Sequence, residues 1–115
     1  MLCHLRSLYL CVSDMARAIR FYEALLEMPV TVRDAVYSVF DIDGFRLGLF
    51  ANATQNEPHT LGTSCVPSID VPDLATLRQT LCGREIAFPL TQIGQNWVAE
   101  IVDSEGNRLE LTAPL

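Results

Sequence analysis

Apolar residues recur with a helical period at two places along the chain. In the first, apolar residues stand at positions i, i+3, i+4, i+7, i+10 and i+11: Met15, Ala18, Ile19, Tyr22, Leu25 and Leu26. A weaker copy of this pattern spans residues 74–81. Such spacing predicts two amphipathic helices. Ser13 or Asp14 can accept hydrogen bonds from the first turn of the first helix, and Pro29 ends it, while Gly83 ends the second.

The two helices belong to a longer repeat. Each follows a short run of apolar and β-branched residues, at 8–12 and at 68–71, which predicts a strand. When Asp14 is placed over Asp73, the apolar positions of the strands and helices coincide. The chain therefore carries two copies of a strand-helix unit.

The end of each copy matches as well. Residues 41–49 and 103–111 can be aligned position by position, and each reads as a strand, a Gly turn and a returning strand. One more strand-like piece precedes each hairpin, near Val30–Arg33 and near Ile86–Leu90. Each half therefore reads β-α-β-β-β. The alternative is a generic α+β domain whose two hairpins are alike by chance.

Two local motifs carry a family resemblance. Val12–Glu23 resembles the strand-to-helix signature, and Asp103–Leu111 the "D-P-x-G-N-x-x-E-L" ending, of the vicinal-oxygen-chelate superfamily (glyoxalases, bleomycin-resistance proteins, extradiol dioxygenases). The resemblance implies an α+β fold in which two tandem βαβββ modules form a cup-shaped, eight-stranded half-open barrel. It implies one domain, with module one at 1–52, a linker at 53–62 and module two at 63–115. Its members differ widely in reaction, so the fold does not give the function.

The chain departs from the family pattern at two positions outside the expected site. Glu27 stands where the family usually has Gly after the first helix, and Pro67 interrupts the first strand of module two. A proline there suggests an edge or a bend.

The family's metal site can be tested position by position. Metal-using relatives place one ligand on the first and one on the last strand of each module. The resemblance and strand alternation together put these positions at Ser7, Gly48, Val66 and Glu110. Only Glu110 is a competent ligand, whereas a catalytic metal normally needs three. We therefore expect no metal and no cofactor; the alternative is a divalent Zn, Mn, Fe or Ni ion held by Glu110 or by His59 of the linker.

Alternation predicts a small-molecule pocket with aromatic walls and few polar groups. Glu110 could orient a ligand or act as a general base, or could form a structural ion pair with Arg108. Trp97 and Phe50 could equally belong to the core. The expected pocket residues are Ser7, Tyr9, Cys11, Tyr37, Arg46, Gly48, Phe50, Val66, Ser68, Trp97, Arg108 and Glu110.

Composition narrows the class of partner. The net charge of −6 argues against nucleic acid and would tolerate a cationic ligand, although such charge also serves solubility. Cys3, Cys11, Cys65 and Cys82 are scattered, and we expect them to be buried free thiols. No signal peptide or membrane-spanning run is evident, so we expect no membrane partner and a cytoplasmic location.

Two functions stay open. The first is a metal-free protein that binds a flat or cationic small organic molecule, as the superfamily's drug-sequestering members do. The second is an enzyme of the same superfamily, a lyase, isomerase or dioxygenase, in which Glu110 is the catalytic base or a metal ligand. By the same resemblance we expect a homodimer.

Overall fold

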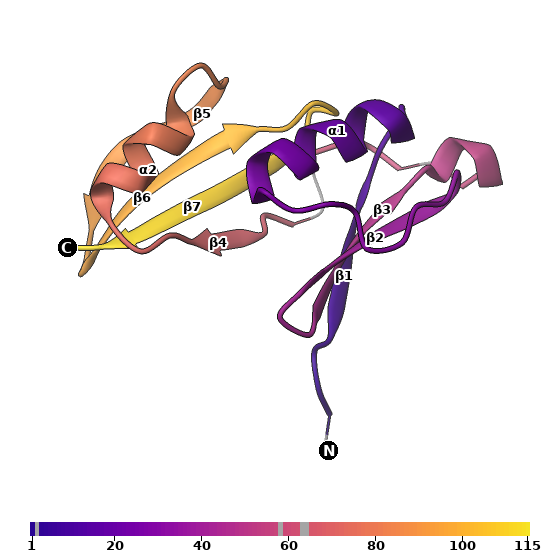
Figure 1. Ribbon diagram of the computed structural model, residues 1–115, viewed down its shortest axis with the longest axis horizontal. Helices are drawn as coiled ribbons and strands as arrows, with labels where there is room; N and C mark the ends of the chain where they lie inside the picture. Colours follow the sequence, from indigo (N-terminus) through magenta and orange to yellow (C-terminus); the bar gives the residue numbers. More distant parts are fainter. Residues whose placement is uncertain (2, 58, 63–64) are drawn as a thin grey trace. The chain divides into compact units, whose positions relative to one another are not determined.

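Each half of the chain forms its own sheet and helix. The computed structural model describes residues 1, 3–57, 59–62 and 65–115. These residues divide into unit one, Met1–Leu61, and unit two, Gly62–Leu115, each with its own sheet and long helix (Figure 1). The cup-shaped arrangement expected for the two modules stays a prediction. No described helix is long and apolar enough to cross a membrane.

Unit one holds a three-stranded sheet. Its central strand, β3, pairs in parallel with β1 and antiparallel with β2, which gives the order β1-β3-β2. The β2-β3 pair is the hairpin predicted around Gly44. The elements are β1 (Ser7–Cys11), α1 (Met15–Leu26), β2 (Tyr37–Ile42), β3 (Phe45–Phe50) and the short 3-10 helix η1 (Asn52–Gln55).

Unit two repeats this plan with one strand more. The order is β4-β7-β6-β5, in which β4 runs parallel to β7 and the other pairs are antiparallel. The predicted β-α-β-β-β reading of the second half is therefore confirmed. The elements are β4 (Ser68–Asp70), α2 (Leu74–Leu81), β5 (Ile86–Ile93), β6 (Asn96–Val102) and β7 (Arg108–Pro114).

The strand expected near Val30–Arg33 does not form a full strand. The backbone N–H groups of Thr31 and Val32 both donate to the carbonyl of Val39, at 2.9 and 3.0 Å, so two residues oppose one. This bulge-like pairing interrupts the regular hydrogen-bond ladder of a strand. Only an isolated bridge between Val32 and Val39 forms as a result. The described residues therefore form seven strands, where eight were expected.

The helices cover the apolar face of each sheet. In unit one Ala18, Ile19 and Tyr22 of α1 are buried, and the Tyr22 ring lies 6.2 Å from that of Phe40 on β2. In unit two Leu77 of α2 is fully buried, and α2 packs against β7. In β7 the buried residues alternate as predicted, at Leu109, Leu111 and Ala113. In β2 and β3, by contrast, three consecutive residues are buried in each strand, 38–40 and 47–49.

Both helices begin at an aspartate. The backbone N–H of Arg17 donates to the Asp14 carboxylate at 3.0 Å, and that of Thr76 to Asp73 at 2.7 Å. The hydrogen bonds from Thr76 lower the pKa of the Asp73 carboxyl, because they favour its charged form. Of the two caps considered for the first helix, Asp14 is the N-cap residue.

Glu27 closes α1 in a conformation that favours glycine, with φ at 54°. We expect Glu27→Gly to raise the free energy of unfolding by about 1 kcal/mol, because a side chain at positive φ is strained. Urea unfolding followed by far-UV circular dichroism would measure the gain. Glu27→Ala is the matched control, since it removes the charge and keeps the strain. An equal gain in both variants would attribute the effect to charge and contradict this reading.

Candidate functional site

The sheet of unit one presents a second face, opposite α1, that carries most of the expected pocket residues. Tyr9 pairs with Gly48 across β1 and β3, and Phe50 pairs with both Cys11 and Tyr37. Since paired residues point to the same side, these five share one face. Ser7 and Arg46 pair at the end of the same face, and both are exposed.

Four rings on this face form what we call the aromatic cluster: Tyr9, Tyr37, Phe50 and His59. The Tyr9 ring centroid lies 6.1 Å from Tyr37, 5.4 Å from Phe50 and 6.4 Å from His59. Phe50 also lies 6.1 Å from Tyr37 and 6.4 Å from His59. Tyr9 and Tyr37 stay 40% and 37% exposed, so the cluster offers ring surface to a ligand.

Tyr37 fills the space beside Gly48. A Cβ added at Gly48 would lie 2.2 Å from the Tyr37 hydroxyl oxygen and 2.4 Å from Cζ of the same ring. No side chain fits at this position while the ring stays in place. Gly48 is therefore the residue that lets the Tyr37 ring lie against β3.

A tight turn sets the backbone before Tyr37. The backbone N–H groups of Val36 and Tyr37 donate to Oδ2 of Asp34 at 2.9 and 3.1 Å, and the Ser38 hydroxyl donates to the Asp34 carbonyl at 2.7 Å. The two hydrogen bonds from the backbone lower the pKa of the Asp34 carboxyl. Burial raises the pKa of the Tyr37 phenol, with the Arg46 charge acting against it and Tyr9 adding to it.

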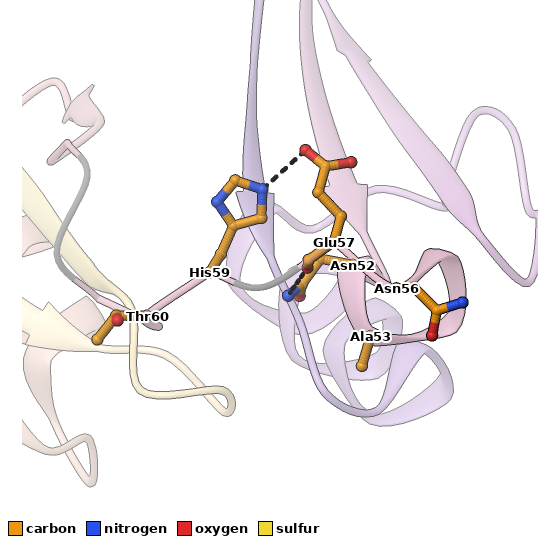
Figure 2. Close-up of a pocket in the computed structure, with 6 residues that line it drawn as sticks. All are labelled: Asn52, Ala53, Asn56, Glu57, His59 and Thr60. Carbon is orange, nitrogen blue, oxygen red and sulfur yellow. Dashed lines mark hydrogen bonds and ion pairs between the residues drawn. The ribbon is translucent and has the colours of Figure 1, made fainter.

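His59 enters the cluster from the segment that follows η1. Its Nε2 lies 2.9 Å from Oε1 of Glu57, an ion pair when the imidazole is protonated and a hydrogen bond otherwise. Both residues line a cavity of about 590 Å³. Figure 2 shows the pair together with the other lining residues, all of unit one. The residues that line this cavity are Asn52, Ala53, Asn56, Glu57, His59 and Thr60.

Cys11 is half-buried beside this region. Burial raises the pKa of its thiol, and the negative charge of Glu57 raises it further. The thiol therefore stays protonated and is a poor nucleophile. The other three cysteines are exposed free thiols, which contradicts the expectation that all four would be buried, because the runs that hold them lie outside the sheets and helices.

The sheet of unit two carries Glu110 on the face opposite α2. The Ser68 hydroxyl donates to Oε1 of Glu110 at 2.7 Å. Glu110 pairs across the strands with Glu100, and Arg108 bonds Glu100 at 2.9 Å. Arg108 therefore forms an ion pair with Glu100, and not with Glu110 as the structural alternative for Glu110 had it. Glu100 was not among the expected pocket residues, although alternation along residues 96–102 could have identified it.

Two expected pocket residues are placed differently from the rest. Trp97 pairs with Ala113, which puts it on the same face as the buried Leu111 and away from the face of Glu110. This differs from the expected facing, because the register of β6 against β7 and not the strand's own pattern decides it. Val66 lies before β4 and is 46% exposed.

The four family ligand positions do not suit a metal ion. Within unit one, Ser7 offers a neutral hydroxyl, and Gly48 offers no side chain where Tyr37 occupies the space. Within unit two, Val66 has no donor atom, and Glu110 is a single carboxylate. Among the residues that the structure describes, no three His, Cys, Asp or Glu side chains come together in a way that could hold a metal ion.

The motif at Asp103–Leu111 is structural in unit two. Oδ1 of the buried Asp103 accepts the backbone N–H groups of Glu105 and Asn107 at 2.8 Å each. The Asn107 side chain donates to Oδ2 of Asp103 at 3.1 Å and accepts the backbone N–H of Gly62 at 3.0 Å. These bonds build the β6-β7 turn and fasten residue 62 to it.

Known proteins of the same fold are numerous. Residues 3–111 match the model of the family described as Glyoxalase/Bleomycin resistance protein/Dioxygenase superfamily. A protein of Agrobacterium tumefaciens, solved by NMR in solution, has a TM-score of 0.83 and 20% sequence identity, with 99% of each chain covered. No curated protein is significantly similar in sequence.

Two further structures illustrate the range of relatives. A glyoxalase/bleomycin resistance protein/dioxygenase family enzyme of Burkholderia phytofirmans has a TM-score of 0.82 at 14% identity, covering 98% of this chain and 100% of its own. A lactoylglutathione lyase of Agrobacterium tumefaciens has a TM-score of 0.75 at 14% identity, covering 96% and 92%. At such identity these similarities concern the fold.

Proposed function

Because the chain belongs to the Glyoxalase/Bleomycin resistance protein/Dioxygenase superfamily, we propose that it is a metal-free protein that binds a flat small organic molecule. The observation that carries the proposal is the aromatic cluster on the face of unit one where metal-using relatives place their ligands. Three of its four rings come from strands, so the sheet holds them in fixed positions.

The chemistry of the cluster suits a flat apolar ring. Aromatic faces and edges attract one another beyond the area they bury, and Tyr9 and Tyr37 remain open to an incoming ring. The Glu57 carboxylate beside the cluster would also accept a donor or a positive charge. Sequestration of an aromatic drug is the form of binding that this composition supports best.

Nitrobenzene, a flat ring without a proton to donate, is the probe that tests this proposal. We expect saturable binding that shifts the NMR signals of the Tyr9, Tyr37 and Phe50 ring protons. The affinity should be the same in a chelator and in added Zn, Mn, Fe or Ni, because no metal takes part. Shifts spread over the whole chain, or binding that requires one of these ions, would contradict the proposal.

The alternative is an enzyme that uses Glu110 as base or metal ligand. It has weaker support, because a catalytic metal normally needs three protein ligands and no such group of side chains includes Glu110 among the described residues. Metal analysis of protein purified without chelators distinguishes the two functions. One equivalent of bound metal, lost together with an activity in Glu110→Ala, would favour the enzyme. Pairing of two chains stays a prediction that light scattering can check.

A further inference from the structure

The imidazole of His59 is held in one orientation from two sides. Its ring meets Tyr9 and Phe50 edge-on, with interplanar angles of 75° and 68°. Its Nε2 lies 2.9 Å from the Glu57 carboxylate. A surface histidine without such contacts would turn freely, whereas this one keeps one edge on the cluster and one nitrogen on Glu57.

The second nitrogen is left for another partner. A neutral imidazole that donates through Nε2 to a carboxylate carries its acceptor lone pair on Nδ1. Figure 2 shows Nδ1 on the side of the ring that faces away from Glu57. A carboxylate behind a histidine also stabilises the imidazolium that forms when Nδ1 takes a proton. Glu57 and His59 together therefore have the groups that a proton acceptor needs.

We propose that the Glu57–His59 pair accepts a proton from the ligand of the aromatic cluster, and that this ligand is a phenol. The inference rests on the proposed binding function and names its ligand class. The phenol O–H bond breaks, an N–H bond forms at Nδ1, and the products are a phenolate and an imidazolium. Glu57 holds the imidazolium, so no further reactant is needed.

Other ligand classes fit this pair less well. A carboxylic acid is already ionised at neutral pH, so it has no proton left to transfer to Nδ1. An ammonium ligand would interact with the Glu57 carboxylate only. The Nδ1 lone pair of His59 would then make no use of its position beside the ligand.

The other titratable groups nearby are Tyr9 of β1, Tyr37 of β2 and Cys11. The Arg46 charge acts on the Tyr37 phenol, and the Glu57 charge acts on the Cys11 thiol. None of these phenol and thiol groups offers the nitrogen lone pair of an imidazole.

The test compares two probes that differ by one hydroxyl group, 4-nitrophenol and nitrobenzene. Nitrophenolate absorbs at longer wavelength than nitrophenol, so the absorption spectrum reports the proton transfer directly. We expect the protein to bind 4-nitrophenol about tenfold more tightly than nitrobenzene at neutral pH. The bound 4-nitrophenol should also be ionised to a greater extent than the free compound.

Two variants locate the proton acceptor. His59→Phe keeps an aromatic ring and removes both nitrogens, so the affinity ratio of the two probes should fall to about one and the phenolate signal should disappear. Glu57→Gln keeps the imidazole and should reduce the phenolate signal in part. A wild-type ratio of one, or an unchanged spectrum in His59→Phe, would overturn the inference and leave the binding function standing. Failure of both probes to bind would overturn both.

Discussion

Replacing Tyr9 with alanine should lower the affinity for nitrobenzene by about thirtyfold, the largest effect expected at the aromatic cluster. Tyr9 contacts each of the other three rings, at 5.4 to 6.4 Å. Phe50 does so too, but Tyr9 is the more exposed of the two. Its removal deletes the central surface and also loosens its neighbours. Because the Tyr9 side chain is 40% exposed, the fold should survive, and circular dichroism would verify this.

Two controls separate the cluster from general surface hydrophobicity. Ile42→Ala removes an apolar side chain of similar exposure, 37%, at the far end of β2 and outside the cluster. Its affinity for nitrobenzene should equal that of the wild type. Tyr9→Phe keeps the ring and should retain most of the affinity. An equal loss in Ile42→Ala and Tyr9→Ala would refute the cluster as the binding site.

Gly48 offers an independent route to the same site. Gly48→Ala places a Cβ where the Tyr37 ring lies, so the ring must move although Tyr9 is unchanged. We expect the affinity to fall by about tenfold. In the Tyr37→Ala background the same substitution should cost little more, since the clash no longer exists. Additive losses would show that Gly48 does not act through Tyr37.

The second large effect concerns stability. Asp103→Ala should lower the free energy of unfolding of unit two by about 3 kcal/mol. Asp103 is 6% exposed, and its carboxylate accepts two backbone N–H groups and the Asn107 amide. Alanine would leave these buried donors without this acceptor. Trp97, the single tryptophan of the chain, lies in β6 and reports urea unfolding of this unit by fluorescence.

The repeat supplies a matched control for this substitution. Asp41 occupies the aligned position in unit one, where it is exposed and accepts the backbone N–H of Gly44 at 2.9 Å. Asp41→Ala should cost no more than about 1 kcal/mol, measured by circular dichroism. Similar costs at the two positions would mean that burial of the Asp103 network is not the cause.

The sequence motif and the candidate site thus have different roles. The motif at Asp103–Leu111, which carries much of the family resemblance, fixes a turn and fastens Gly62 to it. Such a motif identifies the fold because the fold needs the turn, and it contains no information about the ligand. The cluster that we expect to bind the ligand contains no residue of either motif.

Local patterns along the chain predicted most of the elements and many of the strand faces. Helix period, aspartate caps and strand alternation are local properties, so α1, α2, both hairpins and the shared face of Tyr9, Gly48 and Phe50 could be predicted. Tertiary structure decided which residues meet. No repeating pattern in the linker sequence predicts that His59 contacts Tyr9. The strand expected near residues 30–33 did not form, because Thr31 and Val32 both pair with Val39 in a bulge.

Strand pairing decided the rest of the site. Alternation tells which residues of one strand share a face. Only the register between strands shows on which side of the sheet Trp97 lies, and that Arg108 pairs with Glu100 and not with Glu110. The closeness of Tyr37 to Gly48 likewise depends on how β2 pairs with β3. A hydrophobic pattern along one strand specifies which side chains share a face of the sheet. Which residues contact each other depends on how two segments pair.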